Sequence, residues 1–207
     1  MLIETLPVEA KQSALDVVAA AFADHPLMPP DKPGKLKGSA ARRMMGPLFG
    51  AFAKAPDLHW FGVRREDDPS KLRSFALVFE YGYEPPLIKL PGMVWMLMRS
   101  HGLRNALAFM RVLSQKHPGD DRRLELLILA TDPNQQAKGL GRAMLQHLYE
   151  WAAERGYKAV VLESAKAPPA YDFYLREGFV VEKEVDLPNG VLCYMRRELG
   201  VETQPTD

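Results

Sequence analysis

The order of apolar and polar positions is most regular in the middle of the chain, where strand-length and helix-length patterns alternate. Residues 124–130 form an apolar run interrupted by one carboxylate, which predicts a strand buried on both faces. A turn at 132–134 ends this run, and apolar residues then recur at helical spacing from Met144 to Ala152. Residues 159–163 predict a second buried strand. Strand, helix and strand in this order imply a right-handed crossover, with the two strands parallel in one sheet.

The flanking patterns predict the remaining elements of an α/β chain with a mixed sheet. Before the central unit they predict a short edge strand at 2–6, a helix from Pro7 to Phe22, a helix at 40–54, and two antiparallel strands at 58–63 and 72–81. After it they predict a short helix that Pro168 and Pro169 open and that runs through Glu177, then a hairpin of strands at 180–185 and 191–196 around an Asn-Gly turn. Gly46 and Pro47 favour a kink or a break in the second helix.

Residues 91–116 have the least regular pattern. Their apolar positions are interrupted by Arg99, His101, Arg104 and other polar residues, too often for a membrane span of about 20 apolar residues. We therefore expect one or two amphipathic helices, broken near Gly102 and inserted between the predicted hairpin and the central strand. Such a helical insert would serve as a lid or wall over an acceptor site, as an added core layer, or as a dimer contact.

Composition is that of an ordinary globular protein. The 207 residues are 47% hydrophobic and 26% charged, which suits one domain at 1–200 with a tail at 201–207. A net charge of +1 offers no field of one sign, so neither nucleic acid nor a membrane is an expected partner. The single cysteine, Cys193, excludes an intramolecular disulfide and a cysteine-built metal site. Without a secretory signal at the amino-terminal end, a cytoplasmic location is expected.

A short glycine loop joins the central strand to the helix that follows it. Gly139 and Gly141 let the backbone approach an anion without a Cβ in the way, and the first N–H groups of a helix have no internal partner. The helix dipole favours negative charge at the same end, and Lys138 and Arg142 add full positive charges. The loop therefore suits a pyrophosphate; the alternative is that both glycines serve only the turn and packing.

Two motifs in this half of the chain resemble those of the GNAT superfamily of N-acetyltransferases. Gln136, Gly139 and Gly141 match its Q/R-x-x-G-x-G/A signature, and Tyr174 with the Gly-Phe pair at 178–179 resembles its Tyr-x-x-x-Gly-Phe segment. The resemblance is close over 123–197 and loose over 58–122. It implies a GNAT-like acyl-CoA N-acyltransferase fold, in which two central parallel strands splay apart and acetyl-CoA lies between them.

The resemblance also implies roles for individual residues. The pantetheine arm of acetyl-CoA would pair with the backbone of Ile128, Leu129 and Ala130. Its pyrophosphate would be held by the N–H groups of Gln136, Ala137, Lys138, Gly139, Leu140, Gly141 and Arg142. Tyr174 would be the general acid that protonates the leaving thiolate, and Tyr171, about one helical turn earlier, is a rival donor.

The general base stays open between several groups. Glu125 is a carboxylate in an apolar strand, where burial would raise its pKa toward a useful range. Glu163 ends the neighbouring predicted strand. Each also has a purely structural interpretation, as a paired or strand-end carboxylate. His117 and His101 are further candidates for the base.

The implied activity is the transfer of an acetyl group from acetyl-CoA to a primary amine of a small molecule, without a metal ion. Two positions depart from the family pattern, since Ala-Pro-Pro-Ala at 167–170 stands where an asparagine is common and Thr131 replaces an apolar residue. The missing asparagine and the unassigned base leave an inactive acyl-CoA-binding sensor or interaction module as an alternative. Transfer of a longer acyl group, which the apolar insert would accommodate, is another, and a homodimer is compatible with the same insert.

Overall fold

The computed structural model describes residues 2–25, 31, 33–52, 58–81, 98, 103, 107, 117–119, 121–136, 139–187 and 190–200. Within them, seven strands form one sheet in the order β1-β2-β3-β4-β5-β7-β6. The strands are β1 (Glu4–Thr5), β2 (Leu58–Arg64), β3 (Leu72–Glu80), β4 (Arg123–Thr131), β5 (Ala159–Ala165), β6 (Val180–Leu187) and β7 (Gly190–Glu198). Neighbouring strands are antiparallel except β4 and β5, which are parallel. The predicted mixed sheet and its parallel central pair are confirmed.

The helices also follow the predicted pattern. They are η1 (Val8–Ala10), α1 (Lys11–Ala21), α2 (Ser39–Phe52), η3 (Pro133–Gln135), α5 (Leu140–Glu154) and α6 (Ala170–Arg176). The expected break in α2 is wrong, because the helix continues through Gly46 and Pro47. Met45 and Phe49 of this helix are buried against a core that includes Trp60. This packing outweighs the poor helix propensity of glycine and proline.

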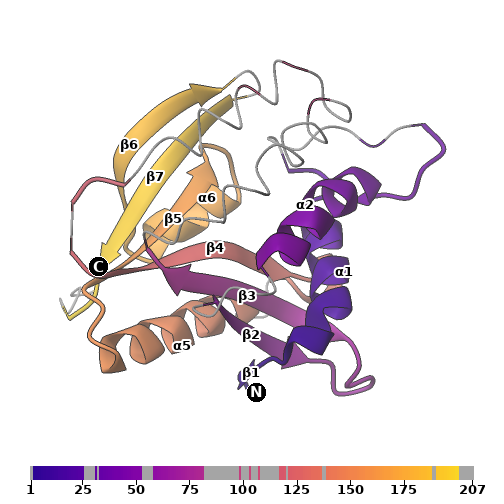
Figure 1. Ribbon diagram of the computed structural model, residues 1–207, viewed down its shortest axis with the longest axis horizontal. Helices are drawn as coiled ribbons and strands as arrows, with labels where there is room; N and C mark the ends of the chain where they lie inside the picture. Colours follow the sequence, from indigo (N-terminus) through magenta and orange to yellow (C-terminus); the bar gives the residue numbers. More distant parts are fainter. Residues whose placement is uncertain are drawn as a thin grey trace.

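Helices cover both faces of the sheet (Figure 1). α1 and α2 lie on one face, over a core that contains Phe49 and Phe75. α5 lies on the other face, where Met144 and Leu148 are fully buried. α6 adds its aromatic residues to the α5 side of the core. Because successive strand residues point to opposite faces, β2, β3 and β4 supply both cores by alternation.

The central parallel pair opens soon after it begins. β4 and β5 pair at three positions, of which the last joins Glu125 to Val161. Just beyond this point the β3–β4 register shifts between Leu77 and Val78, which leaves Leu127 as an extra residue in β4. Such a bulge bends its strand. Among the described strands, residues 126–131 of β4 therefore pair with β3 alone, and we call their other side the open β4 edge.

Several predicted features lie outside the described residues. They are most of the insert at 91–116, Asn189 of the predicted Asn-Gly turn, and the tail at 201–207. Within the insert, Met98, Leu103 and Leu107 are helical, and their side chains are exposed. In the part of the chain that the structure describes, no helix combines the length and apolar character that a membrane crossing requires. The same residues contain no group of three or more His, Cys, Asp or Glu suited to a metal ion.

Candidate active site

The glycine loop leaves the start of α5 open. Asp132 accepts hydrogen bonds from the N–H and the side-chain amide of Asn134 at 2.9 and 3.2 Å, which closes the turn of η3 directly after β4. Gly139 precedes α5 with a φ of 75°, a left-handed conformation that favours glycine. No described side chain caps α5, and its first turn contains no acidic residue. The first N–H groups of α5 thus remain available to an anion, together with the positive end of the helix dipole.

The two glycines of the loop have different surroundings. A Cβ built on Gly139 would meet no described atom within 4 Å, so this position borders open space. A Cβ on Gly141 would lie 3.5 Å from the ring of Phe173 in α6. Gly141 therefore also serves the packing of α5 against α6, and the neighbouring Leu140 is buried in the core. The packing interpretation therefore applies to Gly141, and anion binding at Gly139 stays a prediction.

The polar residues of the loop lie at the surface. Gln136 is exposed and extended. Arg142 is also exposed, and its guanidinium lies 3.2 Å from the carboxylate of Glu177, so part of its charge is already compensated. Ala137 and Lys138, the other two predicted phosphate-loop residues, lie outside the described residues.

Ile128, Leu129 and Ala130 line the open β4 edge with their backbone. Their side chains belong to the two cores, while their backbone pairs with β3 on one side. An antiparallel strand directs its N–H and C=O groups alternately to its two sides, so half of these groups have no strand partner among the described residues. An extended arm with amide groups could bind there as an added strand. The edge leads into the loop before α5, so one elongated ligand would reach both.

Tyr174 lies on α6, on the same side of the sheet as α5. Its ring centroid is 5.6 Å from that of Phe179 and 5.3 Å from that of Phe173. Burial raises the pKa of Tyr174 above its ordinary value of 10, which keeps the phenol protonated at neutral pH. A protonated hydroxyl is what a general acid requires. Tyr171, the rival donor, is half-buried against the same core.

Glu125 and Glu163 lie on the opposite face of the sheet, where β4 and β5 part. Leu124 and Leu126 belong to the core under α5, so alternation turns Glu125 to the other face. Glu163 is two residues beyond Val161, the last position of β5 that pairs with β4. Burial, and after it the negative charge of Glu163, raise the pKa of Glu125 well above its ordinary value of 4.5. The two predicted carboxylates are thus brought together.

His117 completes this group from the segment that precedes β4. Its side chain is fully buried, with Nε2 3.3 Å from Glu163 and Nδ1 3.5 Å from Glu182. The rings of Tyr81 and Tyr194 meet the imidazole edge-on. We call Glu125, Glu163, Glu182 and His117 the Glu–His cluster. His101, the other histidine proposed as a base, lies outside the described residues.

Sequence reasoning missed the residues that hold this cluster in place. Arg123 is 2% exposed, and its guanidinium lies 4.3 Å from the ring centroid of Tyr81. The same guanidinium donates to three carbonyls of the segment 118–121. The Tyr81 hydroxyl accepts a hydrogen bond from the His117 N–H at 2.6 Å. The available signal was an arginine at the start of an apolar strand, since a buried guanidinium needs several acceptors around it.

The predicted acid and the predicted bases therefore lie on opposite faces of the sheet, at the place where strand pairing is interrupted. Figure 1 shows β5, β6 and β7 diverging from β1 to β4 at this place. Among the described strands, no pairing joins β4 to β5 beyond Glu125.

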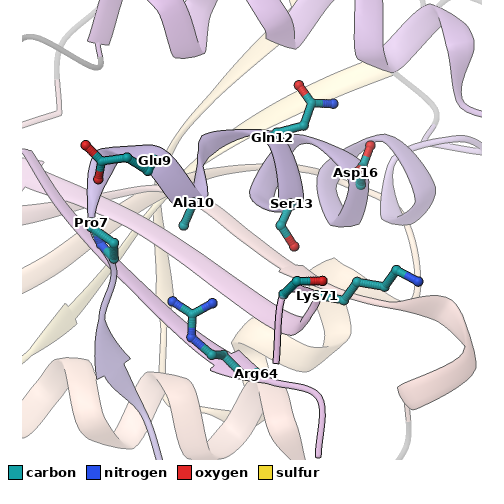
Figure 2. Close-up of a pocket in the computed structure, with 9 residues that line it drawn as sticks. Pro7, Glu9, Ala10, Gln12, Ser13, Asp16, Arg64 and Lys71 are labelled. Carbon is teal, nitrogen blue, oxygen red and sulfur yellow. The ribbon is translucent and has the colours of Figure 1, made fainter. Parts of the chain in front are cut away.

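A cavity of about 430 Å³ lies elsewhere, between α1 and the loop that joins β2 to β3. Figure 2 shows Ser13 of α1 and Arg64 of β2 pointing toward each other across it. Ser13 accepts a hydrogen bond from the N–H of Leu72 at 3.0 Å, and Arg64 donates to the carbonyl of Pro69 at 2.8 Å and pairs with Glu4. These contacts tie α1 and β1 to the hairpin. None of the predicted site residues lines this cavity.

Comparison with known proteins agrees with this geometry. The model of the acetyltransferase (GNAT) family matches residues 57–179. A search of curated proteins found no match. Solved structures of similar fold include arylalkylamine N-acetyltransferase 2 from Aedes aegypti, with a TM-score of 0.65 and 15% identity over 96% of this chain and 99% of that one.

Two further structures share the fold. The structure of histone acetyltransferase HPA2 and related acetyltransferase from Corynebacterium glutamicum has a TM-score of 0.63 and 20% identity, over 98% of each chain. PaiA N-acetyltransferase from Thermoplasma acidophilum, in complex with coenzyme A, has a TM-score of 0.57 and 15% identity, over 96% of this chain and 99% of that one. Since the family model covers more than half of its length, the chain belongs to the GNAT family of acetyltransferases.

Proposed function

We propose that this protein transfers an acetyl group from acetyl-CoA to a primary amine of a small molecule. The observation that carries the proposal is the open β4 edge, which leads into the uncapped start of α5. Coenzyme A joins an extended arm with amide groups to a pyrophosphate, and these two parts suit the two binding elements in that order. The coenzyme A complex of PaiA and the arylalkylamine N-acetyltransferase of the same fold support the cosubstrate and an amine acceptor.

Each predicted site residue has a part in this reaction. The backbone of 128–130 holds the pantetheine arm, and the N–H groups of 136–142 hold the pyrophosphate. Acetyl-CoA supplies the acetyl thioester. As the amine nitrogen bonds to the acetyl carbon, a carboxylate of the Glu–His cluster takes the proton that the nitrogen loses. As the carbon–sulfur bond breaks, the Tyr174 hydroxyl donates its proton to the sulfur.

The acceptor is expected to approach the face of the sheet that carries the Glu–His cluster. Three carboxyl groups gather there, and ionised carboxylates attract an ammonium group. The near-neutral charge of the whole chain adds no long-range preference for nucleic acid. A small cationic amine in the cytoplasm is therefore the proposed acceptor, and neither a metal ion nor a membrane has a part in the proposal.

Substituting Tyr174→Phe tests the function, with Tyr171→Phe as a matched control on the same helix. Loss of the general acid is expected to lower kcat by about 100-fold or more. The affinity for coenzyme A should stay unchanged, because the phenylalanine ring keeps the packing against Phe179 and Phe173. The measurement is thiol release from acetyl-CoA with a panel of primary amines, together with calorimetric titration of coenzyme A.

The outcomes separate the alternatives. Normal coenzyme A binding without thiol release by the wild type, for any amine, would favour an inactive binding module. A loss of turnover in Tyr171→Phe but not in Tyr174→Phe would assign the acid role to the rival tyrosine. Repeating the assay with longer acyl-CoA esters tests the acyl group, and a clear preference for acetyl-CoA would exclude the longer-chain alternative.

A further inference from the structure

The buried imidazole of His117 lies between two carboxylates from different strands. Nε2 is 3.3 Å from Glu163 of β5, and Nδ1 is 3.5 Å from Glu182 of β6. Nε2 is buried, and its contact with Glu163 is an ion-pair approach without the alignment of a hydrogen bond. Long contacts of this kind often tighten when substrate binds. The imidazole thus lies within contact distance of both carboxylates and restrains the position of each.

The position of His117 is fixed by the chain on either side of the insert. The hydroxyl of Tyr81, directly after β3, accepts the His117 N–H at 2.6 Å. Arg123, at the start of β4, holds the carbonyls that follow His117, and Tyr194 of β7 packs edge-on against the ring at 5.0 Å. The imidazole is therefore held by β3, β4 and β7 while its nitrogens face β5 and β6.

The two carboxylates nearest the open β4 edge have unequal surroundings. Glu163 lies beside the His117 ring, and its side chain is 24% exposed, so solvent can reach it. Glu125 is affected by burial and by the negative charge of Glu163. Both effects disfavour the ionised form of Glu125. Where the surroundings of two carboxyl groups differ in this way, the groups take different roles.

We propose that His117 is a positioning residue that holds Glu163 in place, so that Glu163 rather than Glu125 takes the proton of the acceptor amine. This inference rests on the proposed acetyl transfer. Glu163 accepts the proton as the nitrogen–carbon bond forms and then releases it to solvent through its exposed side. Glu125 in its protonated form adds no competing negative charge beside Glu163, and it can donate a hydrogen bond.

The other groups around His117 surround it from further sides. Glu182 lies 3.5 Å from Nδ1, and Arg196 lies 3.9 Å from Glu182. Burial raises the pKa of both Tyr81 and Tyr194, so both phenols are neutral near pH 7. Arg123 contacts the Tyr81 ring, the backbone carbonyls that follow His117, and Asp121.

The test substitutes His117→Gln and measures kcat for acetyl transfer together with the affinity for coenzyme A, with His147→Gln as the control. Glutamine is of similar size but cannot contact both carboxylates as the imidazole does. The variant should lose about 10- to 100-fold in kcat, because Glu163 is no longer held in place. Its affinity for coenzyme A should stay unchanged, because the proposed cosubstrate site is formed by the open β4 edge and the start of α5. His147 lies on α5 beside Phe61, away from the cluster, and its substitution should leave both quantities unchanged.

The outcomes distinguish this inference from the proposed function. An unchanged kcat in His117→Gln, with normal turnover by the wild type, would overturn the inference and leave the acetyl transfer standing. Absence of turnover by the wild type would overturn both. Glu163→Gln and Glu125→Gln provide a second measurement in case His117→Gln does not fold. The inference requires the larger loss of kcat in Glu163→Gln, and a larger loss in Glu125→Gln would contradict it.

Discussion

At the scale of single residues, charge and burial decide which groups of the site can react. Arg123 is buried, and its guanidinium has three carbonyl acceptors and an aromatic ring around it. Burial, and after it the charge of a second carboxylate, raise the pKa of Glu125. The arginine therefore has partners that compensate its burial, whereas the surroundings of the glutamate favour its neutral form.

Glu125→Gln is expected to change how stability depends on pH. Because the pKa of Glu125 is higher in the folded state than in the unfolded one, the wild type loses stability as the pH rises from about 4.5 through the folded-state pKa. Glutamine cannot ionise and lacks this loss. Above that range, the unfolding free energy of the variant relative to the wild type should be higher than it is below pH 4.5.

Urea unfolding of both proteins across pH 4 to 8 measures this difference in about eight steps. Two stability curves that stay parallel over the whole range would show that Glu125 ionises in the folded state as it does in the unfolded chain. This result would contradict the proposal that Glu125 is neutral beside Glu163.

At the scale of elements, α5 connects the core to the proposed cosubstrate. Its buried residues, among them Met144 and Leu148, hold it against the sheet, while its first turn has no side-chain cap. Glycines in left-handed conformation precede and follow it, Gly139 with φ 75° and Gly156 with φ 76°. A Cβ on either would meet no described atom within 4 Å. The two ends are thus sterically matched, and they differ in the sign of the helix dipole.

Gly139→Glu and Gly156→Glu form a matched pair that tests the cosubstrate site. Each places a side chain at a left-handed position and should cost about 1 to 2 kcal/mol of stability. Only Gly139→Glu brings a negative charge to the proposed pyrophosphate site, where repulsion of several kcal/mol should weaken acetyl-CoA binding by at least about 100-fold. Calorimetric titration of acetyl-CoA gives the affinities, and equal weakening by both substitutions would rule out a site at the start of α5.

At the scale of the whole molecule, two groups of strands meet at a short parallel junction. β1 to β4 form one group and β5 to β7 the other, and β4 pairs with β5 at three positions. α5 packs on β3, β4 and β5 and so bridges both groups. A ligand at the open β4 edge would satisfy backbone groups that lack a strand partner among the described residues.

Amide hydrogen exchange should detect this effect of the ligand. Alternate amides of 126–130 that face away from β3 are expected to exchange rapidly in the free protein and to slow when coenzyme A is added. Val160 and Val161 pair with both β4 and β7 and should be protected in either state. The measurement is exchange followed by NMR with and without coenzyme A. Unchanged exchange at 126–130 under saturating ligand would contradict strand-like binding.

The sequence was sufficient to predict the features that depend on residues close together in the chain. The apolar run at 124–130 and the helical spacing after Gly139 depend on neighbouring residues, and both elements formed as predicted. Gly139 adopts the positive φ that makes glycine useful there. The parallel arrangement of β4 and β5 follows from the strand–helix–strand order, since a helical crossover joins parallel neighbours. Local propensity misled at Gly46 and Pro47, where tertiary packing kept the helix continuous.

The sequence by itself thus determined the elements, the family motif and the glycine loop, because each depends on spacing within a short segment. Only the tertiary structure decided which polar groups share a site. His117 reaches Glu182 across 65 positions of sequence, and Tyr81 and Arg123 hold it from two different strands. Such contacts depend on strand order and on the face to which each residue points. The Glu–His cluster therefore exists only once β4, β5, β6 and β7 have assembled into one sheet.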